Sequence, residues 1–357
     1  MKNFFFILPA FKNLSGHEGS FVKIFYNICK KKKFIFNLVI PKDNKEKIIP
    51  NKFKILPNFH NKYFYKKIIN LFKFYIEIKN NISCNKKNIF LIDGLRFVYT
   101  LPLLLFFITN KKQNIILFYI RDYFSKYSIK NFILVFFFRL LKNRFDRIVL
   151  LTDSFYIFKK LKTNHKESYF LPIPHIIKIK KKIKKLKRPL IFLPGPYRED
   201  KGKKNLLFFI KNNIKKNFYI LINEKFSISN KLRQLIKFED SLGKNEYINY
   251  LNQCSFVILP YISDFYKFRT SGIFVESISI AKPVFVSSNT WMANQLIKFG
   301  LEKLVINDWR LLNLDTLIDI INQKNIKNKL KKMRISFVKY HNETNYINTF
   351  CKILEKK

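Results

Sequence analysis

The segment from Leu190 to Ile210 reads LIFLPGPYREDKGKKNLLFFI, and its pattern indicates the fold class of this chain. Its first four residues form a short, continuously apolar run, which is typical of a strand covered on both faces in a parallel sheet. Its last eight residues, from Lys203, have a helix-like pattern, and a turn that contains Gly195 joins the two parts. A strand that leads through such a turn into a helix is the repeating unit of a βαβ fold.

Comparable apolar runs, separated by stretches of helix length, recur along the chain in two series. The first series is Phe4–Leu8, Phe34–Ile40, Ile89–Ile92, Ile115–Ile120 and Arg147–Leu151. The second series is Leu190–Leu193, Phe218–Ile222, Phe256–Leu259 and Pro283–Ser287. We therefore predict an α/β protein with two Rossmann-like, doubly wound parallel-sheet domains that face a cleft.

The predicted domain organisation follows from the two series of strands and the lysine-rich segment between them. Residues 1–177 form the first domain, residues 178–189 a basic linker, and residues 190–325 the second domain. Residues 326–357 have apolar spacing typical of helices, and their return to the first domain is left open.

The chain of 357 residues is 48% hydrophobic and carries a formal net charge of +46. Such a composition can form two buried cores, and it excludes a disordered protein. The charge favours nucleic acid or an anionic membrane face as a partner. The abundance of Lys, Asn, Ile and Phe equally fits compositional drift in an AT-rich genome, and both interpretations stay open.

Cysteine spacing and apolar run length exclude several further classes of protein. Cys29, Cys84, Cys254 and Cys351 form no CxxC pair, so we expect buried thiols in a reducing compartment and no metal site. The runs Leu101–Ile108 and Phe132–Leu141 are shorter than the roughly 20 residues of a membrane-spanning helix. We predict a cytoplasmic protein without such a helix, although either run could lie in a membrane interface.

The turn after the strand Leu190–Leu193 is a candidate anion-binding site. The carboxyl end of a strand that leads into a helix is where an α/β sheet binds anions. Gly195 would permit close backbone approach, and Arg198 and Lys201 would supply two cations. The alternative is an ordinary exposed turn in a lysine-rich chain.

A second such turn follows the strand that ends at Leu259, and its sequence through Ser277 is LPYISDFYKFRTSGIFVES. The triplet Thr-Ser-Gly at 270–272 opens a predicted helix whose first N–H groups could hold a diphosphate. Glu276, about one turn further on, could accept hydrogen bonds from ribose hydroxyls. The alternative is a capped helix with an exposed glutamate.

These two turns resemble the carboxyl-terminal domain of GT-B glycosyltransferases of the GT4 kind, the glycosyl transferases group 1. The segments Leu242–Pro260 and Ser287–Leu296 resemble the parts of that domain that frame the base and follow the next strand. Phe268 stands where the family often has a first glutamate, and Ala281 replaces a usual glycine. We assign donor binding to Gly195, Arg198, Lys201, Gly202, Tyr261, Thr270, Ser271, Gly272 and Glu276.

The first half resembles the family through the segment NLSGHEGSF, from Asn13 to Phe21. The resemblance implies a glycine-containing loop facing the cleft, with Gly16, Gly19 and His17 in it. Asp122 follows another strand and is a candidate base on the acceptor side. An ion pair of Asp122 with Arg121 or Arg96 is the alternative.

The resemblance implies a hexosyltransferase-like enzyme that uses a nucleotide-diphosphate sugar, needs no cofactor or metal, and retains the anomeric configuration. It implies a glycan or lipid-linked acceptor in bacterial lipopolysaccharide or capsule biosynthesis, and peripheral contact with anionic membrane at the inner face of the cytoplasmic membrane. One alternative is an inactive nucleotide-sugar-binding protein. A basic nucleic-acid-binding protein is disfavoured because no RRM, KH or zinc-finger pattern is present.

Overall fold

The computed structural model describes residues 2–9, 11, 14, 16–44, 52–56, 64–82, 88–94, 97–109, 114–121, 148–177, 188–195, 198–213, 216, 218–222, 236–238 and 242–357. The chain divides into two compact units. Unit 1 comprises Met1–Leu171 and Ile347–Lys357, and unit 2 comprises Pro172–Tyr346. Residues 178–187 of the predicted linker lie outside the described residues.

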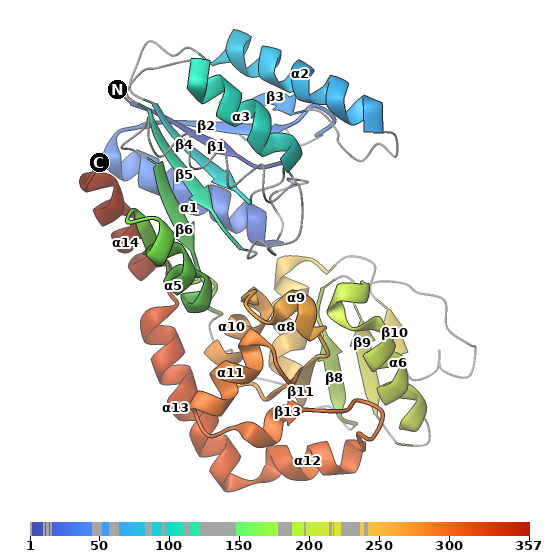
Figure 1. The fold of residues 1–357 in the computed structure, drawn as a ribbon. Coiled ribbons are helices and arrows are strands. Elements are labelled where there is room, and N and C mark those ends of the chain that lie inside the picture. The colour runs from blue at the N-terminus through green and yellow to red at the C-terminus, as the bar shows by residue number, and fades with distance from the viewer. Residues whose placement is uncertain are drawn as a thin grey trace. The chain divides into compact units, whose positions relative to one another are not determined.

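Unit 1 is built on a seven-stranded sheet in the order β3-β2-β1-β4-β5-β6-β7, with every neighbouring pair parallel (Figure 1). Its strands are β1 (Asn3–Ile7), β2 (Ile35–Pro41), β3 (Lys52–Leu56), β4 (Asn88–Asp93), β5 (Ile115–Tyr119), β6 (Ile148–Thr152) and β7 (Ser168–Phe170). Its helices are α1 (Gly16–Lys32), α2 (Phe64–Asn81), α3 (Phe97–Thr109) and α5 (Phe155–Asn164).

The core of unit 1 is rich in phenylalanine and includes the end of the chain. Phe4 of β1 and Phe25 of α1 stack with ring centroids 5.7 Å apart. Phe350, in α14 (Glu343–Glu355), packs edge-on against Phe25 at 5.0 Å and is fully buried. This aromatic packing gives residues 347–357 a place in unit 1, because burying a large aromatic side chain contributes several times the thermal energy.

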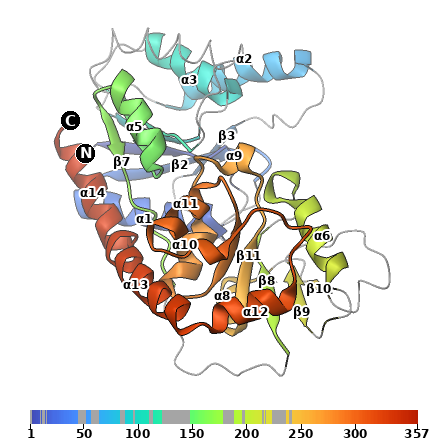
Figure 2. The same cartoon turned by 60° about the horizontal axis from the view of Figure 1, so that its bottom comes forward.

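Unit 2 is built on a six-stranded sheet in the order β10-β9-β8-β11-β12-β13, again with every neighbouring pair parallel. Its strands are β8 (Leu190–Leu193), β9 (Tyr219–Ile222), β10 (Ile236–Phe238), β11 (Phe256–Leu259), β12 (Val284–Ser287) and β13 (Val305–Ile306). Its helical elements are η1 (Glu199–Lys201), α6 (Lys203–Asn212), α8 (Lys244–Gln253), α9 (Ser263–Tyr266), α10 (Gly272–Ser279), α11 (Trp291–Lys298), η2 (Glu302–Leu304), α12 (Leu314–Asn322) and α13 (Lys324–Tyr340). Figure 2 shows the same elements from a second direction.

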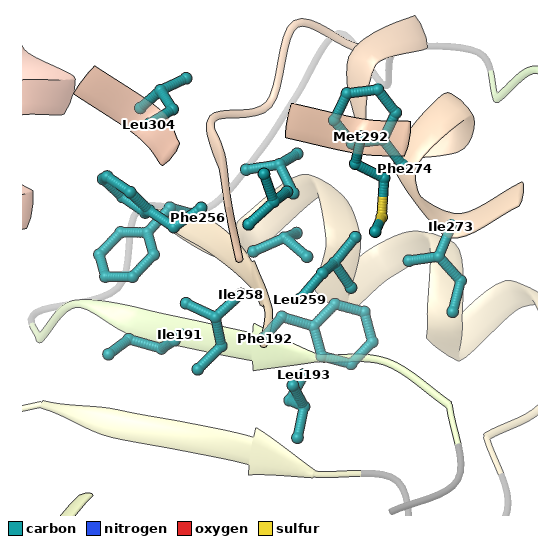
Figure 3. Packing of buried hydrophobic residues seen from close by; sticks show 14 of the residues in the cluster. Ile191, Phe192, Leu193, Phe256, Ile258, Leu259, Ile273, Phe274, Met292 and Leu304 are labelled. Carbon is teal, nitrogen blue, oxygen red and sulfur yellow. The ribbon is translucent and has the colours of Figure 1, made fainter. Parts of the chain in front are cut away.

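Side chains from the two central strands of unit 2 form its core beneath the helix α10. Figure 3 shows Phe192 of β8 next to Leu259 of β11, with Ile273 and Phe274 of α10 above them. Phe192, Leu259 and Phe274 are fully or almost fully buried. The two strands and α10 are therefore fixed relative to one another by apolar contact.

A buried asparagine holds α6 to the chain that enters α12. The Asn213 side chain donates to the carbonyl oxygens of Phe209 and Leu312, at 2.8 and 3.0 Å. Its Oδ1 accepts the backbone N–H of Leu314 at 2.7 Å. All three bonds replace water at a residue that is 1% exposed, so they fix one end of both helices.

The predicted α/β class with two parallel sheets is confirmed, and each predicted apolar run coincides with a strand. The prediction missed four strands, which are short or interrupted by polar residues: β3, β7, β10 and β13. The predicted helices in the tail are confirmed as α13 and α14, which bury Leu330, Met333 and Phe337 among others.

The run Leu101–Ile108 forms most of α3, and Phe132–Leu141 lies outside the described residues. In the described part of the chain, no helix combines the length and the apolar character needed to cross a membrane. Cys29, Cys254 and Cys351 are buried free thiols, as expected, and Cys84 lies outside the described residues.

Candidate functional site

The candidate site of unit 2 lies where the strand order of its sheet reverses. β8 is the first strand of the unit, and it pairs with β9 on one side and β11 on the other. The connections that follow β8 and β11 therefore lead to opposite directions in the sheet. In doubly wound sheets, ligands bind at this position, outside the carboxyl ends of the two strands.

The first corner runs from the end of β8 to the start of α6, and two glycines shape it. Gly195 and Gly202 have φ angles of 90° and 79°, which other residues rarely adopt. A Cβ atom on Gly195 would lie 2.7 Å from the Lys201 Nζ and 3.3 Å from the Ile273 Cδ1. The ammonium of Lys201 therefore lies directly over the Gly195 backbone, next to the first turn of α10.

The second corner runs from the end of β11 to the start of α10. Ser271 is the N-cap residue of α10, and its Oγ accepts the N–H of Phe274 at 3.3 Å. Thr270 precedes this cap, and Gly272 is the first residue of the helix. The predicted helix start is confirmed, and the N–H groups of its first turn have no partner within the helix itself.

The two corners are in direct contact. The N–H of Ile262 donates to the carbonyl oxygen of Asp200 at 3.1 Å, and Asn205 Nδ2 donates to the Pro260 oxygen at 3.1 Å. A Cβ atom on Gly202 would lie only 1.8 Å from the same Pro260 oxygen. Glycine at 202 is thus required for the two loops to pack against each other.

The Tyr261 ring contacts residues of both corners. The Lys201 Nζ lies 5.5 Å from the centroid of the buried Tyr261 ring. That ring packs against Tyr266, with centroids 4.3 Å apart. Lys201, Gly195 and the start of α10 therefore lie close together, and their role as a shared phosphate site stays a prediction.

Arg198 is close to this group, but a carboxylate that the sequence analysis did not consider engages it. Its Nε and Nη2 donate to the two carboxylate oxygens of Asp200, both at 3.0 Å. About half of the Arg198 side chain remains exposed. The guanidinium is therefore oriented by Asp200 while one side stays open to solvent.

A further cation at the second corner was missed. The guanidinium of Arg269 lies 5.3 Å from the centroid of the Tyr266 ring. Arg269 directly precedes the Thr-Ser-Gly triplet, and that position was the available signal.

Glu276 lies in α10 and is only partly accessible, so the alternative of an exposed glutamate is wrong. The hydroxyl of Tyr247, in α8, donates to its carboxylate. Burial raises the pKa of Glu276 to about 7, while the hydrogen bond from Tyr247 and the charge of Lys244 act in the opposite direction. Burial also raises the pKa of Tyr247 well above its ordinary value, and the Tyr247 ring contacts Phe192 at 5.7 Å between centroids.

Tyr247 was not singled out from the sequence, although its segment was. Its partner Glu276 is 29 positions away. The available signal was that Tyr247 lies one turn into a helix that follows a glycine. This signal is weak, because a tyrosine at such a position is common in half-buried helices.

A cavity of about 430 Å³ lies beside Tyr261, within the size range of small-molecule pockets. The Trp309 Nε1 donates to the Ser287 Oγ at 2.9 Å in its wall. The lining combines hydroxyl, amide, carboxylate and aromatic groups: Asn205, Phe208, Tyr261, Ile262, Ser263, Ser287, Ser288, Asn307, Asp308, Trp309 and Arg310. Such a lining suits a ligand with several hydroxyl groups.

In unit 1, the prediction of a glycine-containing loop at residues 16–19 is wrong. Gly16, His17 and Gly19 lie in the first turn of α1, which begins at Gly16. A Cβ atom on Gly19 would lie 1.9 Å from the Leu14 carbonyl oxygen, so glycine lets the chain enter the helix tightly. The His17 side chain is outside what the structure describes.

Asp122 and Arg96 lie outside the described residues, and the predicted role of Asp122 stays a prediction. Arg121 instead pairs with Asp93 at the end of β4, with nitrogen–oxygen distances of 3.1 and 3.3 Å. Within the described residues, no group of three or more His, Cys, Asp and Glu side chains could hold a metal ion.

No protein-family model matches the chain, and no curated protein matches its sequence. Solved structures are similar over nearly its whole length. A glycosyltransferase from Rickettsia africae ESF-5 is 14% identical with a TM-score of 0.65, covering 99% of this chain and 98% of that chain. The trehalose-6-phosphate phosphatase N-terminal domain of Candida albicans is 11% identical with a TM-score of 0.63, covering 99% and 97%.

The glycosyltransferase SnogD from Streptomyces nogalater is 8% identical with a TM-score of 0.60, covering 99% of both chains. At these identities the similarity establishes the fold, which is the GT-B fold. Function has to be argued from the site, because one fold supports many activities.

Proposed function

We propose that this protein is a glycosyltransferase that binds a nucleotide-diphosphate sugar at the two corners of unit 2. The observation that carries the proposal is the position of the Lys201 ammonium over Gly195 and beside Ile273 at the start of α10. A cation, a glycine-containing turn and the first turn of a helix lie close together here, and such a combination suits a diphosphate. Similarity to structures of glycosyltransferases supports the same activity.

In this proposal the corners stabilise the leaving group. The anomeric C–O bond breaks, its electron pair goes to the diphosphate oxygen, and negative charge grows there. Lys201 and Arg198 neutralise that charge, and the N–H groups of Ser271 and Gly272 donate to the phosphate oxygens. Groups already fixed in position stabilise such charge without reorganisation, so they act more strongly on the transition state than water does.

Asp200 keeps Arg198 in place for this role. A bidentate pair restrains the guanidinium in one orientation, which lowers the entropy lost when a phosphate binds. Arg269 adds positive charge next to the same tyrosine pair. The close approach of the backbone at Gly195 and Gly202 and the Thr270 hydroxyl complete the phosphate-binding set.

Glu276 and Tyr247 form the proposed ribose contact. A carboxylate next to a tyrosine hydroxyl offers both acceptors and a donor to a diol. Tyr261 lines the cavity of about 430 Å³, whose polar lining suits the hydroxyl groups of the sugar.

The acceptor side of the proposal rests on unit 1. His17 in the first turn of α1, or Asp122 after β5, accepts the proton of the attacking hydroxyl as its oxygen bonds to the anomeric carbon. We further propose a GT4-like, hexosyl-transferring, metal-independent reaction with retention. The acceptor is a glycan or a lipid-linked glycan of surface polysaccharide biosynthesis, met at the inner face of the cytoplasmic membrane, and the extreme positive charge suits that anionic surface.

The test is binding of nucleoside diphosphates and their sugars, measured by thermal shift over a panel of bases. A ligand that binds the native state raises the melting temperature by mass action. We expect Lys201→Ala to weaken the binding about tenfold or more, because a charge-assisted hydrogen bond contributes about 1.5–3 kcal/mol.

The matched control is Lys204→Ala, which removes the same charge from an exposed position on α6. Equal weakening by both variants would mean that only the general positive field attracts the ligand. No shift with any nucleotide would contradict the donor site. Binding without sugar transfer to any acceptor would support the inactive nucleotide-sugar-binding alternative.

A further inference from the structure

The outer face of α2 carries a narrow stripe of exposed apolar side chains. Ile69, Phe72 and Ile76 are 48%, 63% and 54% exposed. Positions separated by three and four residues lie on one side of a helix. Phe74 and Ile78, which are fully buried, lie on the opposite side, so the stripe points away from the core of unit 1.

The neighbouring helix α3 carries a further exposed apolar side chain. Leu105 is 38% exposed, and the sequence of α3, FVYTLPLLLFFIT, has no charged residue. Tyr75 of α2 and Thr109 of α3 are hydrogen-bonded at 3.3 Å, and Figures 1 and 2 show the two helices side by side. Ile69, Phe72, Ile76 and Leu105 are here called the α2–α3 apolar surface.

Lysines lie on the same helix as the stripe. α2 contains four lysines and one acid, Glu77, which forms an ion pair with Lys42. Lys73 and Lys79 are exposed on the same helix. A helix with apolar side chains outward and lysines beside them matches the boundary between acyl chains and anionic headgroups.

We propose that the α2–α3 apolar surface docks on an anionic lipid membrane. A second copy of the chain fits less well, because two surfaces of a protein with net charge +46 repel each other. On an anionic membrane, each nearby lysine and each apolar side chain that leaves water instead makes the binding free energy more favourable. This inference rests on the part of the proposed function that places the protein at a membrane, and it names the surface that makes the contact. It does not depend on sugar transfer.

The experiment is co-sedimentation with vesicles of phosphatidylglycerol and phosphatidylcholine. We expect the double variant Phe72→Ser/Ile76→Ser to bind about tenfold or more weakly, since two exposed large apolar side chains are lost. The matched control is Leu311→Ser/Ile335→Ser, because these side chains of unit 2 are 83% and 66% exposed. The control should bind within about twofold of the wild-type protein.

A second pair of variants tests the charge. Lys73→Glu/Lys79→Glu should reduce binding to anionic vesicles much more than Lys331→Glu/Lys332→Glu, which gives the same net charge from exposed positions on α13. The wild-type protein should leave the vesicles when salt is raised to ~0.5 M, because salt at this level screens surface charges.

Equal losses for test and control variants would overturn the proposal, as would equal binding to vesicles of phosphatidylcholine alone. A lipid-free dimer that Phe72→Ser/Ile76→Ser dissociates, measured by ultracentrifugation, would assign the surface to a second copy instead. Thermal shift with nucleoside diphosphates is measured on every variant. A protein that binds vesicles as expected and no nucleotide would contradict the proposed function alone.

Discussion

Burial shifts the pKa values of two ionisable groups of unit 2 in opposite directions. The stability of unit 2 should therefore contain two opposing dependences on pH. Burial raises the pKa of Glu276 from 4.5 to about 7. Burial lowers the pKa of His341 from 6.5 to about 4, and its Nδ1 accepts the N–H of Ile173 at 3.0 Å. Between pH 4.5 and pH 6.5 the native unit therefore holds its proton on Glu276, whereas the unfolded chain holds it on His341.

The dependence of unfolding free energy on pH follows the difference in bound protons between the two states. Glu276 stabilises the native state fully below pH 4.5, and this contribution is lost as the pH rises to about 7. His341 stabilises the native state fully above pH 6.5, and this contribution is lost as the pH falls to about 4. Each contribution amounts to about 3 kcal/mol at about 1.4 kcal/mol per pKa unit, so the two slopes cancel in the wild-type protein.

Single substitutions should reveal the two slopes separately. In Glu276→Gln, the unfolding free energy should rise by about 3 kcal/mol between pH 4 and pH 6.5, because only His341 titrates. In His341→Asn, which keeps a hydrogen-bond acceptor, it should fall by about 3 kcal/mol between pH 4.5 and pH 7.

Urea unfolding followed by tryptophan fluorescence measures both effects. The two tryptophans of the chain, Trp291 and Trp309, both lie in unit 2, so the signal reports that unit. Glu302→Gln, which removes the same charge from an exposed position, is the control and should follow the wild-type curve. A Glu276→Gln curve parallel to that of the wild-type protein at every pH would refute the reasoning.

Two further predictions concern the packing that holds the site. Gly202→Ala combines φ 79° with a Cβ atom 1.8 Å from the Pro260 oxygen, so it should lower the unfolding free energy of unit 2 by about 3 kcal/mol or more. Gly243→Ala, with φ −60° and its nearest contact at 3.4 Å, should change it by less than about 1 kcal/mol, and equal effects in urea titrations would contradict the assignment. Asn213→Ala should cost about 3 kcal/mol in the same assay because buried partners lose their bonds. The exposed Asn245→Ala should cost little, and a small loss at Asn213 would show that water replaces its side chain.

Much of the site could be predicted because its parts are local in sequence. Gly195 and Gly202 follow closely after the end of β8, and the N-cap Ser271 follows closely after the end of β11, so the parts of each corner are visible together in the sequence. Parallel strands place such ends at one edge of a sheet, so Lys201 and the start of α10 could be expected to meet. The glycine-containing segment at residues 16–19 was mistaken for a loop, because the packing that lets α1 begin at Gly16 leaves no sign in the sequence.

The two series of buried strands could be predicted from the sequence, since continuous apolar runs cannot stay exposed to water and fit few other structures. The sequence by itself did not determine β10 or β13, which have three and two residues and exist because a neighbouring strand supplies hydrogen bonds. Only the tertiary structure placed the Tyr247 hydroxyl on Glu276 and Phe350 in the core of unit 1. Propensity and periodicity act over one or two turns of chain, whereas these contacts join residues that only packing of the whole unit brings together.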